Sequence, residues 1–234
     1  MARALKRPTP APDEAADNAA ASAGALSPAA AVAAVDSDHA TRERLILAAI
    51  TLAELEGPAS VGLREVARRA GVTHGAPYRH FHDREALLVA IAERGFRELL
   101  DHCVASGQGQ SDGELAQPDP LARFWGLGIG YFTFAIQRPG LFRVMFSPEA
   151  ARAPTLRANE GAVFSLCVSS IVAAQRAKKV MAGDAQMLAL VAWSAMHGAA
   201  MLYLDGLVRW AGLDAPPEVL ARELAAQVFR GMKP

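Results

Sequence analysis

The sequence predicts an all-α protein, and three observations support this fold class. Apolar residues recur three and four positions apart over most of the 234 residues, which is the spacing of one face of a helix. No stretch alternates apolar and polar residues with the period of two that a half-buried strand shows. Glycine or proline stands at several ends of the periodic segments, where helices start or stop. We expect a small N-terminal helical unit joined to a larger helical bundle.

The first forty residues differ from the rest. They contain 16 alanines and the prolines Pro8, Pro10, Pro12 and Pro28, but no Phe, Tyr or Trp. Alanine favours helix, yet nothing in this stretch provides an apolar face that a core would bury. We expect residues 1–40 to form a disordered tail.

From Thr41 onward the helical spacing is regular. The first expected helix stops at Gly57-Pro58, and the second, 63–70, stops at Gly71. Thr73 is placed to cap a third helix ending near His80, and Asp83 to cap a fourth, 84–104. Residues 105–120 are rich in turn-forming types and are expected to be a linker. Further helices are expected at 121–137, 140–146, 154–179, 184–210 and 217–231.

The run from Ala185 to Leu204 is long enough to span a membrane, because it has 20 residues without a formal charge. Gln186, Ser194 and many alanines lower its hydrophobicity, and Asp184 and Asp205 stand directly at its ends. A helix that is apolar all round can also be buried on both faces in a soluble assembly. We expect that second arrangement and no membrane partner.

The overall composition is that of an ordinary globular protein. The 24 Lys and Arg residues balance 24 Asp and Glu residues, and 52% of the residues are hydrophobic, which excludes a fully disordered or polybasic chain. Two cysteines, Cys103 and Cys167, cannot form a disulfide framework, and no Cys/His cluster has metal-ligand spacing. No apolar run of a signal peptide follows the first ten residues. We expect a cytoplasmic protein without metal or cofactor.

Positive charge gathers around residues 63–81, where the pattern is that of a helix-turn-helix. Between residues 60 and 84, five arginines stand against two acidic residues, a local charge of 5 − 2 = +3. Gly71 can supply the positive φ of a tight turn, and Val72 and Phe81 are apolar where they can pack against the first helix. In this motif the second helix enters the major groove of DNA. The predicted partner is therefore double-stranded DNA.

Five fragments carry a resemblance to a known family. They are Ile46-Leu-Ala-Ala49, Leu63-Arg-Glu-Val-Ala67, Ala70-Gly-Val-Thr73, Tyr78-Arg-His-Phe81 and Asp83-Arg-Glu-Ala-Leu-Leu88. In this order and spacing, residues 41–104 resemble the DNA-binding domain of TetR-family transcriptional regulators. The chain departs from the family pattern at Gly62, where Ser or Thr commonly caps the helix, and at Pro77, inside the second helix of the motif.

The resemblance implies a role for each matching position. Thr73, Tyr78, His80 and Arg84 match positions that contact DNA phosphates, which fix register without reading sequence. Three residues, His74, Gly75 and Ala76, match the positions that face the bases. Pro77 affects the angle at which the motif meets the groove, and so which bases these three residues face.

Aromatic residues gather in the C-terminal part, residues 121–234, which holds seven of the nine Phe and all three Trp. Aromatic residues at helical spacing fill a core or line a pocket, and for single residues, His197 included, the core interpretation stays open. As a group they favour an apolar ligand site. The candidate ligand contacts are Trp125, Phe132, Phe146, Phe164, Trp193 and His197. The order Pro139-Gly-Leu-Phe142-Arg-Val-Met-Phe146, then Trp193-Ser-Ala-Met-His197-Gly198, resembles a Trp-His-Gly type of TetR-family ligand-binding domain.

The last two expected helices form a hairpin that can pair with a copy of itself in a four-helix interface, so we expect a homodimer. The resulting hypothesis is a regulator, a repressor released from its operator by an apolar small molecule. The alternative is a small all-α enzyme or carrier that uses the aromatic cavity. No HExxH, GxSxG, Walker A or GxGxxG motif occurs, so we assign no catalytic residue and expect no enzyme.

Overall fold

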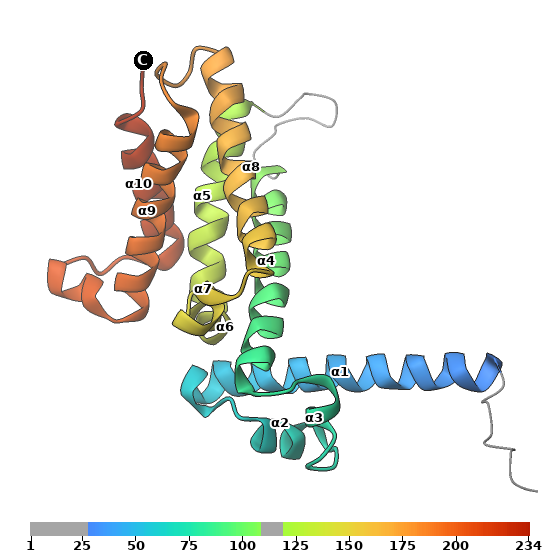
Figure 1. Ribbon diagram of the computed structural model, residues 1–234. Coiled ribbons are helices and arrows are strands. Elements are labelled where there is room, and N and C mark those ends of the chain that lie inside the picture. Colours follow the sequence, from blue (N-terminus) through green and yellow to red (C-terminus); the bar gives the residue numbers. More distant parts are fainter. Residues whose placement is uncertain (1–27, 109–118) are drawn as a thin grey trace, which may run out of the picture. The chain divides into compact units, whose positions relative to one another are not determined.

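A computed structural model describes residues 28–108 and 119–234, except for the side chains of 28–36, 108 and 157–160, and these ranges contain helices and no strand (Figure 1). The chain divides after Ala40 into two units, of which the second is residues 41–234. The expected tail lies outside the described residues from 1 to 27, and the expected linker does so from 109 to 118. The all-α prediction is confirmed.

Helix α1 runs from Pro28 to Glu56, which differs from the expected tail ending at residue 40. Residues 28–40 are helical because alanine has the highest helix propensity. Adding residues to a helix that already exists also avoids the cost of nucleation. An apolar face is therefore not required for this extension to form.

The turn of the helix-turn-helix forms as the sequence predicts. After the 3₁₀ turn η1 (Pro58–Ser60), helix α2 covers Leu63–Ala70 and ends at Gly71, which adopts the left-handed conformation with φ 67°. Helix α3 is only four residues long, Pro77–His80, so the expected start at Thr73 is wrong. Thr73 instead accepts a turn hydrogen bond from Ala76 N through its carbonyl at 3.0 Å. Pro77 takes the first helical position, where its missing N–H leaves no acceptor unpaired.

Helix α4, Arg84–Gln108, begins as expected and ends later. The Asp83 carboxylate accepts a hydrogen bond from Ala86 N at 2.8 Å and so caps the helix. The helix continues four residues beyond the expected end at 104, which shortens the predicted linker. Along its length α4 contacts α5, α6, α7 and α8.

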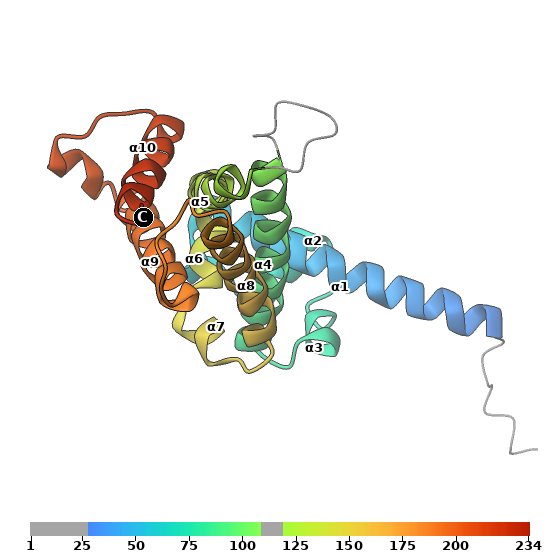
Figure 2. The ribbon, with the colours of Figure 1, turned by 90° about the horizontal axis from the view of Figure 1, so that it is seen from above.

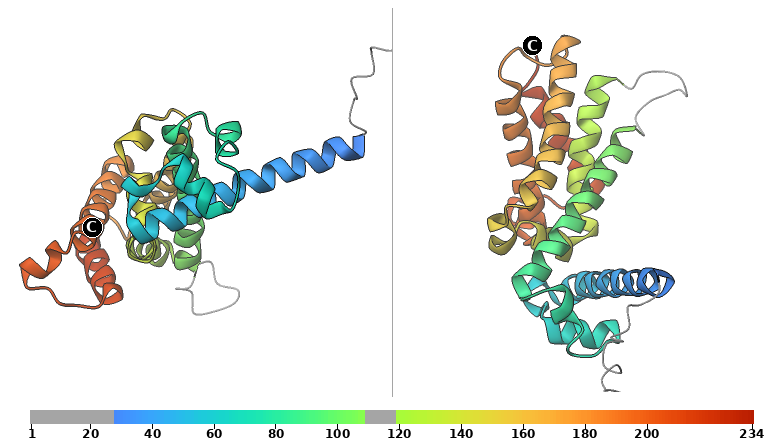
Figure 3. Two further views of the ribbon diagram at one scale, coloured as in Figure 1. Left: turned by 90° about the horizontal axis from the view of Figure 1, so that it is seen from below. Right: turned by 45° about the vertical axis from the view of Figure 1, so that its right-hand side comes forward.

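The C-terminal helices pack around α4 and α5 (Figure 3). Their bounds are α5 Pro120–Gln137, α6 Pro139–Met145, α7 Pro148–Arg152, α8 Leu156–Arg176, α9 Ala185–Leu204, the 3₁₀ turn η2 Leu207–Ala211, and α10 Pro217–Arg230. Viewed from above, α9 and α10 lie together beside α5 (Figure 2). The long helix expected to reach residue 210 ends at 204, because Gly206 turns the chain with φ 73°.

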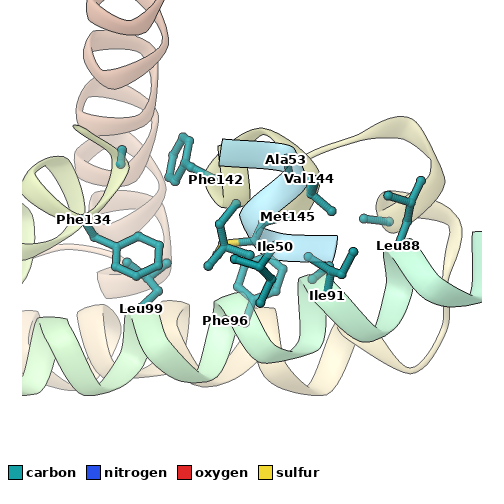
Figure 4. Packing of buried hydrophobic residues seen from close by; sticks show 14 of the residues in the cluster. Ile50, Ala53, Leu88, Ile91, Phe96, Leu99, Phe134, Phe142, Val144 and Met145 are labelled. Atoms are coloured by element: carbon teal, nitrogen blue, oxygen red, sulfur yellow. The ribbon is translucent and has the colours of Figure 1, made fainter. Parts of the chain in front are cut away.

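One apolar core connects the helix-turn-helix to the C-terminal bundle. Figure 4 shows Ile50 and Ala53 of α1 packed with Ile91 and Phe96 of α4 and with Met145 of α6. The same cluster continues into α5, α9 and α10. The predicted boundary at residues 105–120 therefore does not separate two cores, and residues 41–234 form one unit.

Helix α9 is apolar on two opposite faces. Ala189, Ala192, Met196 and Ala200 face the chain's own core, whereas exposed apolar side chains line the opposite face: Met187, Leu190, Val191 and Leu202. By length and composition α9 is the one described helix that could cross a membrane. A single such helix is weak grounds for a span. We expected both faces of α9 to be buried. Within one chain, one face is buried and the opposite face is exposed.

Candidate nucleic-acid interface and ligand cavity

Apart from Arg84, which begins α4, the residues predicted to contact DNA lie on the turn before α3 and on α3 itself. Thr73, His74 and Gly75 are exposed, and Tyr78 is 51% exposed although it is aromatic. Ala76 and His80 are half-buried. Because α3 begins only at Pro77, the base-facing positions of the motif belong to a turn rather than to a helix.

Most arginines of the motif are already engaged within the protein. Arg68 donates two hydrogen bonds to Glu65, which lowers the pKa of that carboxyl. Arg69 pairs with Glu56 at 2.9 Å, and Arg44 donates to the carbonyl of Ala70 at 2.6 Å.

Two arginines of the motif are exposed and form no ion pair among the described residues: Arg64 on α2 and Arg79 on α3. Arg79 lies next to Tyr78, and cations in this position can neutralise DNA phosphates. Arg79 was not among the contacts predicted from the sequence. Its place between the two matched family positions Tyr78 and His80 was the available signal.

Arg84 has protein partners where the family resemblance implied a phosphate. Its Nε donates to the carbonyl of Val61 at 2.7 Å, and its Nη2 donates to the carbonyl of Pro58 at 2.9 Å. Its Nη1 faces Glu149 of α7 at 3.4 Å. All three guanidinium nitrogens are thus engaged, and Arg84 joins the start of α4 to η1 and to α7. The phosphate contact that the resemblance implies would have to replace one of these protein partners.

A second polar connection joins α1, α4 and α6, and we call it the junction. Glu54 of α1 accepts hydrogen bonds from Gly140 N at 2.8 Å and Leu141 N at 3.3 Å, and so caps α6. Arg138 binds Glu54 at 3.1 Å and Glu98 of α4 at 2.8 Å. The three helices are therefore held by a continuous set of charged hydrogen bonds.

The junction also brings two backbones together. A Cβ atom added at Gly140 would lie 2.2 Å from the carbonyl oxygen of Ala53. Glycine is the residue that permits this approach, since every other side chain would collide with the backbone of α1. The start of α6 is fixed on α1 both by shape and by charge.

A cavity of about 70 Å³ lies among α4, α5, α8, α9 and α10. Four of the six predicted ligand contacts line it: Trp125, Phe146, Phe164 and Trp193. Helix α4 contributes Phe96, Leu99 and Cys103. No described lining residue carries a formal charge.

The other two predicted ligand contacts lie elsewhere. Phe132 is fully buried and packs against Tyr203, with the ring centroids 5.8 Å apart. His197 does not line the cavity either. Helical spacing placed both residues on the inner side of their helices, but it did not tell core packing from the cavity wall.

His197 belongs to a short chain of polar groups beside the cavity. The indole N–H of Trp193 donates to the Tyr131 hydroxyl at 3.0 Å, and that hydroxyl lies 2.8 Å from His197 Nδ1. Since the hydroxyl accepts from Trp193, it can donate its own hydrogen to an unprotonated Nδ1. Burial lowers the pKa of His197, which favours the same neutral state.

Both cysteines face the cavity, which the sequence analysis missed. Burial raises the pKa of Cys103 and of Cys167 to about 12. Both groups are therefore neutral thiols near pH 7. Among the residues that the structure describes, no group of three or more His, Cys, Asp or Glu residues could hold a metal ion.

Comparison with protein-family models identifies the two regions separately. Residues 45–91 match the model of bacterial regulatory proteins of the tetR family, and residues 124–228 match the tetracyclin repressor-like C-terminal domain. Together the matches cover more than half of the chain. The chain belongs to the TetR family.

Solved structures agree with the TetR-family fold. A protein of unknown function from Rhodococcus sp. RHA1 is 31% identical, with a TM-score of 0.70 over 83% of this chain and 96% of that chain. NalD of Pseudomonas aeruginosa, the secondary repressor of the MexAB-OprM multidrug efflux pump, is 20% identical, with a TM-score of 0.59 over 85% and 98%. RolR in complex with resorcinol is 20% identical, with a TM-score of 0.59 over 85% and 90%.

The two TetR-family matches coincide with the two sites. The N-terminal match contains the exposed residues of the turn and α3, whereas the C-terminal match contains every described cavity-lining residue outside α4. Helix α4 supplies the remaining three lining residues and begins inside the N-terminal match. It is the element that physically connects the DNA-binding motif to the cavity.

Proposed function

We propose that this TetR-family protein is a cytoplasmic, homodimeric transcriptional repressor that releases its operator when an uncharged, largely apolar molecule occupies the cavity. Residues 41–104 bind DNA, and residues 121–234 bind the effector and dimerise. The observation that carries the proposal is the course of α4. Its first residue, Arg84, is bonded to the helix-turn-helix side at Pro58 and Val61, and its later residues Phe96 to Cys103 line the cavity.

Six of the residues implied by the family resemblance form the proposed DNA contacts. Thr73, Tyr78 and His80 bind phosphates, while His74, Gly75 and Ala76 face the base edges. The exposed side chains of Arg64 and Arg79 support an additional electrostatic contribution. Arg84 acts within the protein instead.

Dimerisation buries the outer face of α9. Met187, Leu190, Val191 and Leu202 form an exposed apolar stripe on this helix, and such stripes mark protein interfaces. An isologous pairing of two α9–α10 hairpins covers both stripes at once. It also presents two recognition motifs, as a site with two half-sites in successive major grooves requires.

The C-terminal domain is proposed to be of the Trp-His-Gly type. The support is the position of Trp193 and His197 on either side of the Tyr131 hydroxyl, directly beside the cavity. RolR holds resorcinol, so this fold is compatible with a small aromatic ligand. NalD, which has this fold, is a repressor, and this supports the repressor role.

The test is a DNA-binding titration with the DNA upstream of the protein's own gene, followed by fluorescence anisotropy at several salt concentrations. We expect specific binding by a dimer, with an affinity that falls steeply with salt. Arg79→Ala should make the negative slope of log affinity against log salt less steep by about one. His74→Ala should relax the preference at one position in each half-site.

The matched control is Arg230→Ala, which removes an exposed cation at the end of α10 and should change neither quantity. Binding that is insensitive to salt, or a monomer that binds with full affinity, would contradict the proposal.

A further inference from the structure

The cavity has a wall residue with an unused hydrogen-bond donor. Trp125 lines the cavity, and its indole Nε1 is the one buried side-chain nitrogen or oxygen atom in the described chain without a hydrogen-bond partner. The ring packs edge-on against Phe229, with a centroid separation of 5.8 Å. A buried donor without an acceptor is costly and rare in folded proteins. It therefore points to an acceptor that arrives from outside the chain.

The other polar groups at the cavity are not buried hydrogen-bond donors that lack an acceptor. Tyr131 both accepts from Trp193 and lies within hydrogen-bond distance of His197. The thiols of Cys103 and Cys167 remain protonated near neutral pH, since burial raises both pKa values. No described lining residue is charged, so a charged ligand would lose its hydration without gaining an ion pair.

The lining favours a flat ring over a flexible chain. Seven aromatic side chains contribute to the wall: Phe96, Phe124, Trp125, Tyr131, Phe146, Phe164 and Trp193. Aromatic rings attract one another edge to face or in offset stacks, beyond the benefit of burying apolar area. A ligand ring can make such contacts with several wall residues at once.

The volume limits the size of the ligand. The cavity of about 70 Å³ is smaller than the roughly 150 Å³ that accommodates benzene in an engineered apolar cavity. Even one aromatic ring must therefore displace side chains on entry. Met196 is a suitable wall residue for this, because methionine is unbranched and adapts its shape at low cost. Two fused rings would require a much larger displacement.

We propose that the cavity selects an uncharged molecule with a single aromatic ring and a hydrogen-bond acceptor that binds the indole N–H of Trp125. That this molecule is the effector rests on the proposed function; that it binds here does not, because binding can be measured without DNA. The chemical class is an aryl ketone, aldehyde, ester or ether rather than an aryl carboxylate.

Calorimetric titration of the full-length protein with two molecules of the same shape tests the contact. Acetophenone carries a carbonyl acceptor where ethylbenzene has a methylene. We compare the ratio of their affinities in the wild type and in Trp125→Phe, which cancels their different hydrophobicity. The ratio should shift against acetophenone by about five- to tenfold when the donor is removed, the worth of one ordinary hydrogen bond. Benzoate should bind at least about tenfold more weakly than acetophenone to the wild type.

The matched control is Trp210→Phe, the same substitution at a tryptophan that is 84% exposed on η2. It should leave the affinity ratio unchanged. An unchanged ratio in Trp125→Phe, or benzoate binding as tight as that of acetophenone, overturns the proposal.

A second measurement needs no variant at Trp125. The chain has three tryptophans and so three indole N–H signals in a ¹⁵N-tryptophan-labelled sample. Acetophenone should move the ¹H chemical shift of the Trp125 indole N–H downfield, because the N–H gains an acceptor. Ethylbenzene should leave this chemical shift close to its value in the free protein. Equal shifts with both molecules overturn the contact. If acetophenone binds in this way but does not release operator DNA, the proposed function fails and this inference stands.

Discussion

The junction and the cavity meet the same stretch of α4, where Glu98 of the junction stands between Phe96 and Leu99 of the cavity wall, and the two regions are built in opposite ways. At the junction, carboxylates and guanidinium groups of α1, α4 and α6 are paired with one another, and Gly140 lets two backbones touch. At the cavity, aromatic and sulfur-containing side chains surround a space that none of them fills. One region fixes the distance between helices, while the other leaves it adjustable.

This difference suggests how occupation of the cavity is conveyed. A ligand that pushes the wall acts on side chains that have room to move, since they line an empty space. At the junction the same helices are held by backbone contact and paired charges, so they move together rather than deform. Phe146 lines the cavity and directly follows α6, whose start is fixed on α1. A displacement of Phe146 is therefore expected to shift α6 and α1 as a unit.

The largest expected effect compares one glycine from each region. Gly140→Ala places a methyl group 2.2 Å from the Ala53 carbonyl, so α6 must leave α1, and the free energy of unfolding should fall by about 3 kcal/mol. Gly128→Ala adds the same methyl group at the cavity, where the nearest atom is 3.8 Å away. It should leave stability unchanged or raise it by up to about 1 kcal/mol through helix propensity.

Urea unfolding of both variants at one protein concentration measures the difference, because a dimer's stability depends on concentration. Equal destabilisation by the two substitutions would mean that the contrast between a tight junction and an adjustable cavity is wrong.

A smaller effect is expected at Arg84, which connects α4 to the helix-turn-helix side. Arg84→Ala removes hydrogen bonds to the Val61 and Pro58 carbonyls and should lower the free energy of unfolding by about 1–2 kcal/mol. Glu149→Gln weakens only a long, partly exposed ion pair and should cost at most about 0.5 kcal/mol.

DNA binding distinguishes this internal role from a phosphate contact. With the internal role, Arg84→Ala weakens operator binding and leaves the slope of log affinity against log salt unchanged. If the slope instead becomes less steep by about one, Arg84 contacts a phosphate, as the family resemblance implied.

The helix-turn-helix was largely predictable because its signals are local. Gly71 adopts the positive φ that the turn requires, and Asp83 caps α4 as expected. The start of α3 was placed too early, because Thr73 was taken as the N-cap and the local rule that proline prefers the first helical position was not applied. Arg84 was assigned to DNA because a sequence cannot show that the carbonyls of Pro58 and Val61 lie within its reach.

The cavity was less predictable, because it depends on which helices face one another. Spacing placed Phe132 and Phe146 alike on inner faces, but only the packing of α9 and α5 separates Phe132, which fills the core, from Phe146, which lines the space. Cys103 and Cys167 are on different helices, and no spacing rule connects them. Trp125 was among the predicted ligand contacts and lines the cavity, whereas its unused N–H became visible only with all its neighbours in place.

The smallest expected effect is a dependence of the free energy of unfolding on pH, which comes from His197 beside the cavity. Burial lowers the pKa of His197 below its usual value near 6.5, so the unfolded chain binds a proton more readily than the folded one as the pH falls. The free energy of unfolding should be constant above about pH 7.5 and should decrease from about pH 7 downward, until the folded-state pKa is passed.

The structure gives this dependence a second cause in the same direction. Protonation of Nδ1 removes the acceptor that faces the Tyr131 hydroxyl, so the Trp193–Tyr131–His197 chain must rearrange. His197→Asn offers an amide oxygen as the acceptor and does not titrate, so the variant should lose less stability between pH 7 and 5 than the wild type. Burial also lowers the pKa of His102, so part of the dependence should remain in His197→Asn. His74→Asn, at an exposed site, should match the wild type. Urea unfolding across this range decides the matter: the same pH dependence in His197→Asn and the wild type would show that His197 does not have to be neutral for the cavity wall to keep its arrangement.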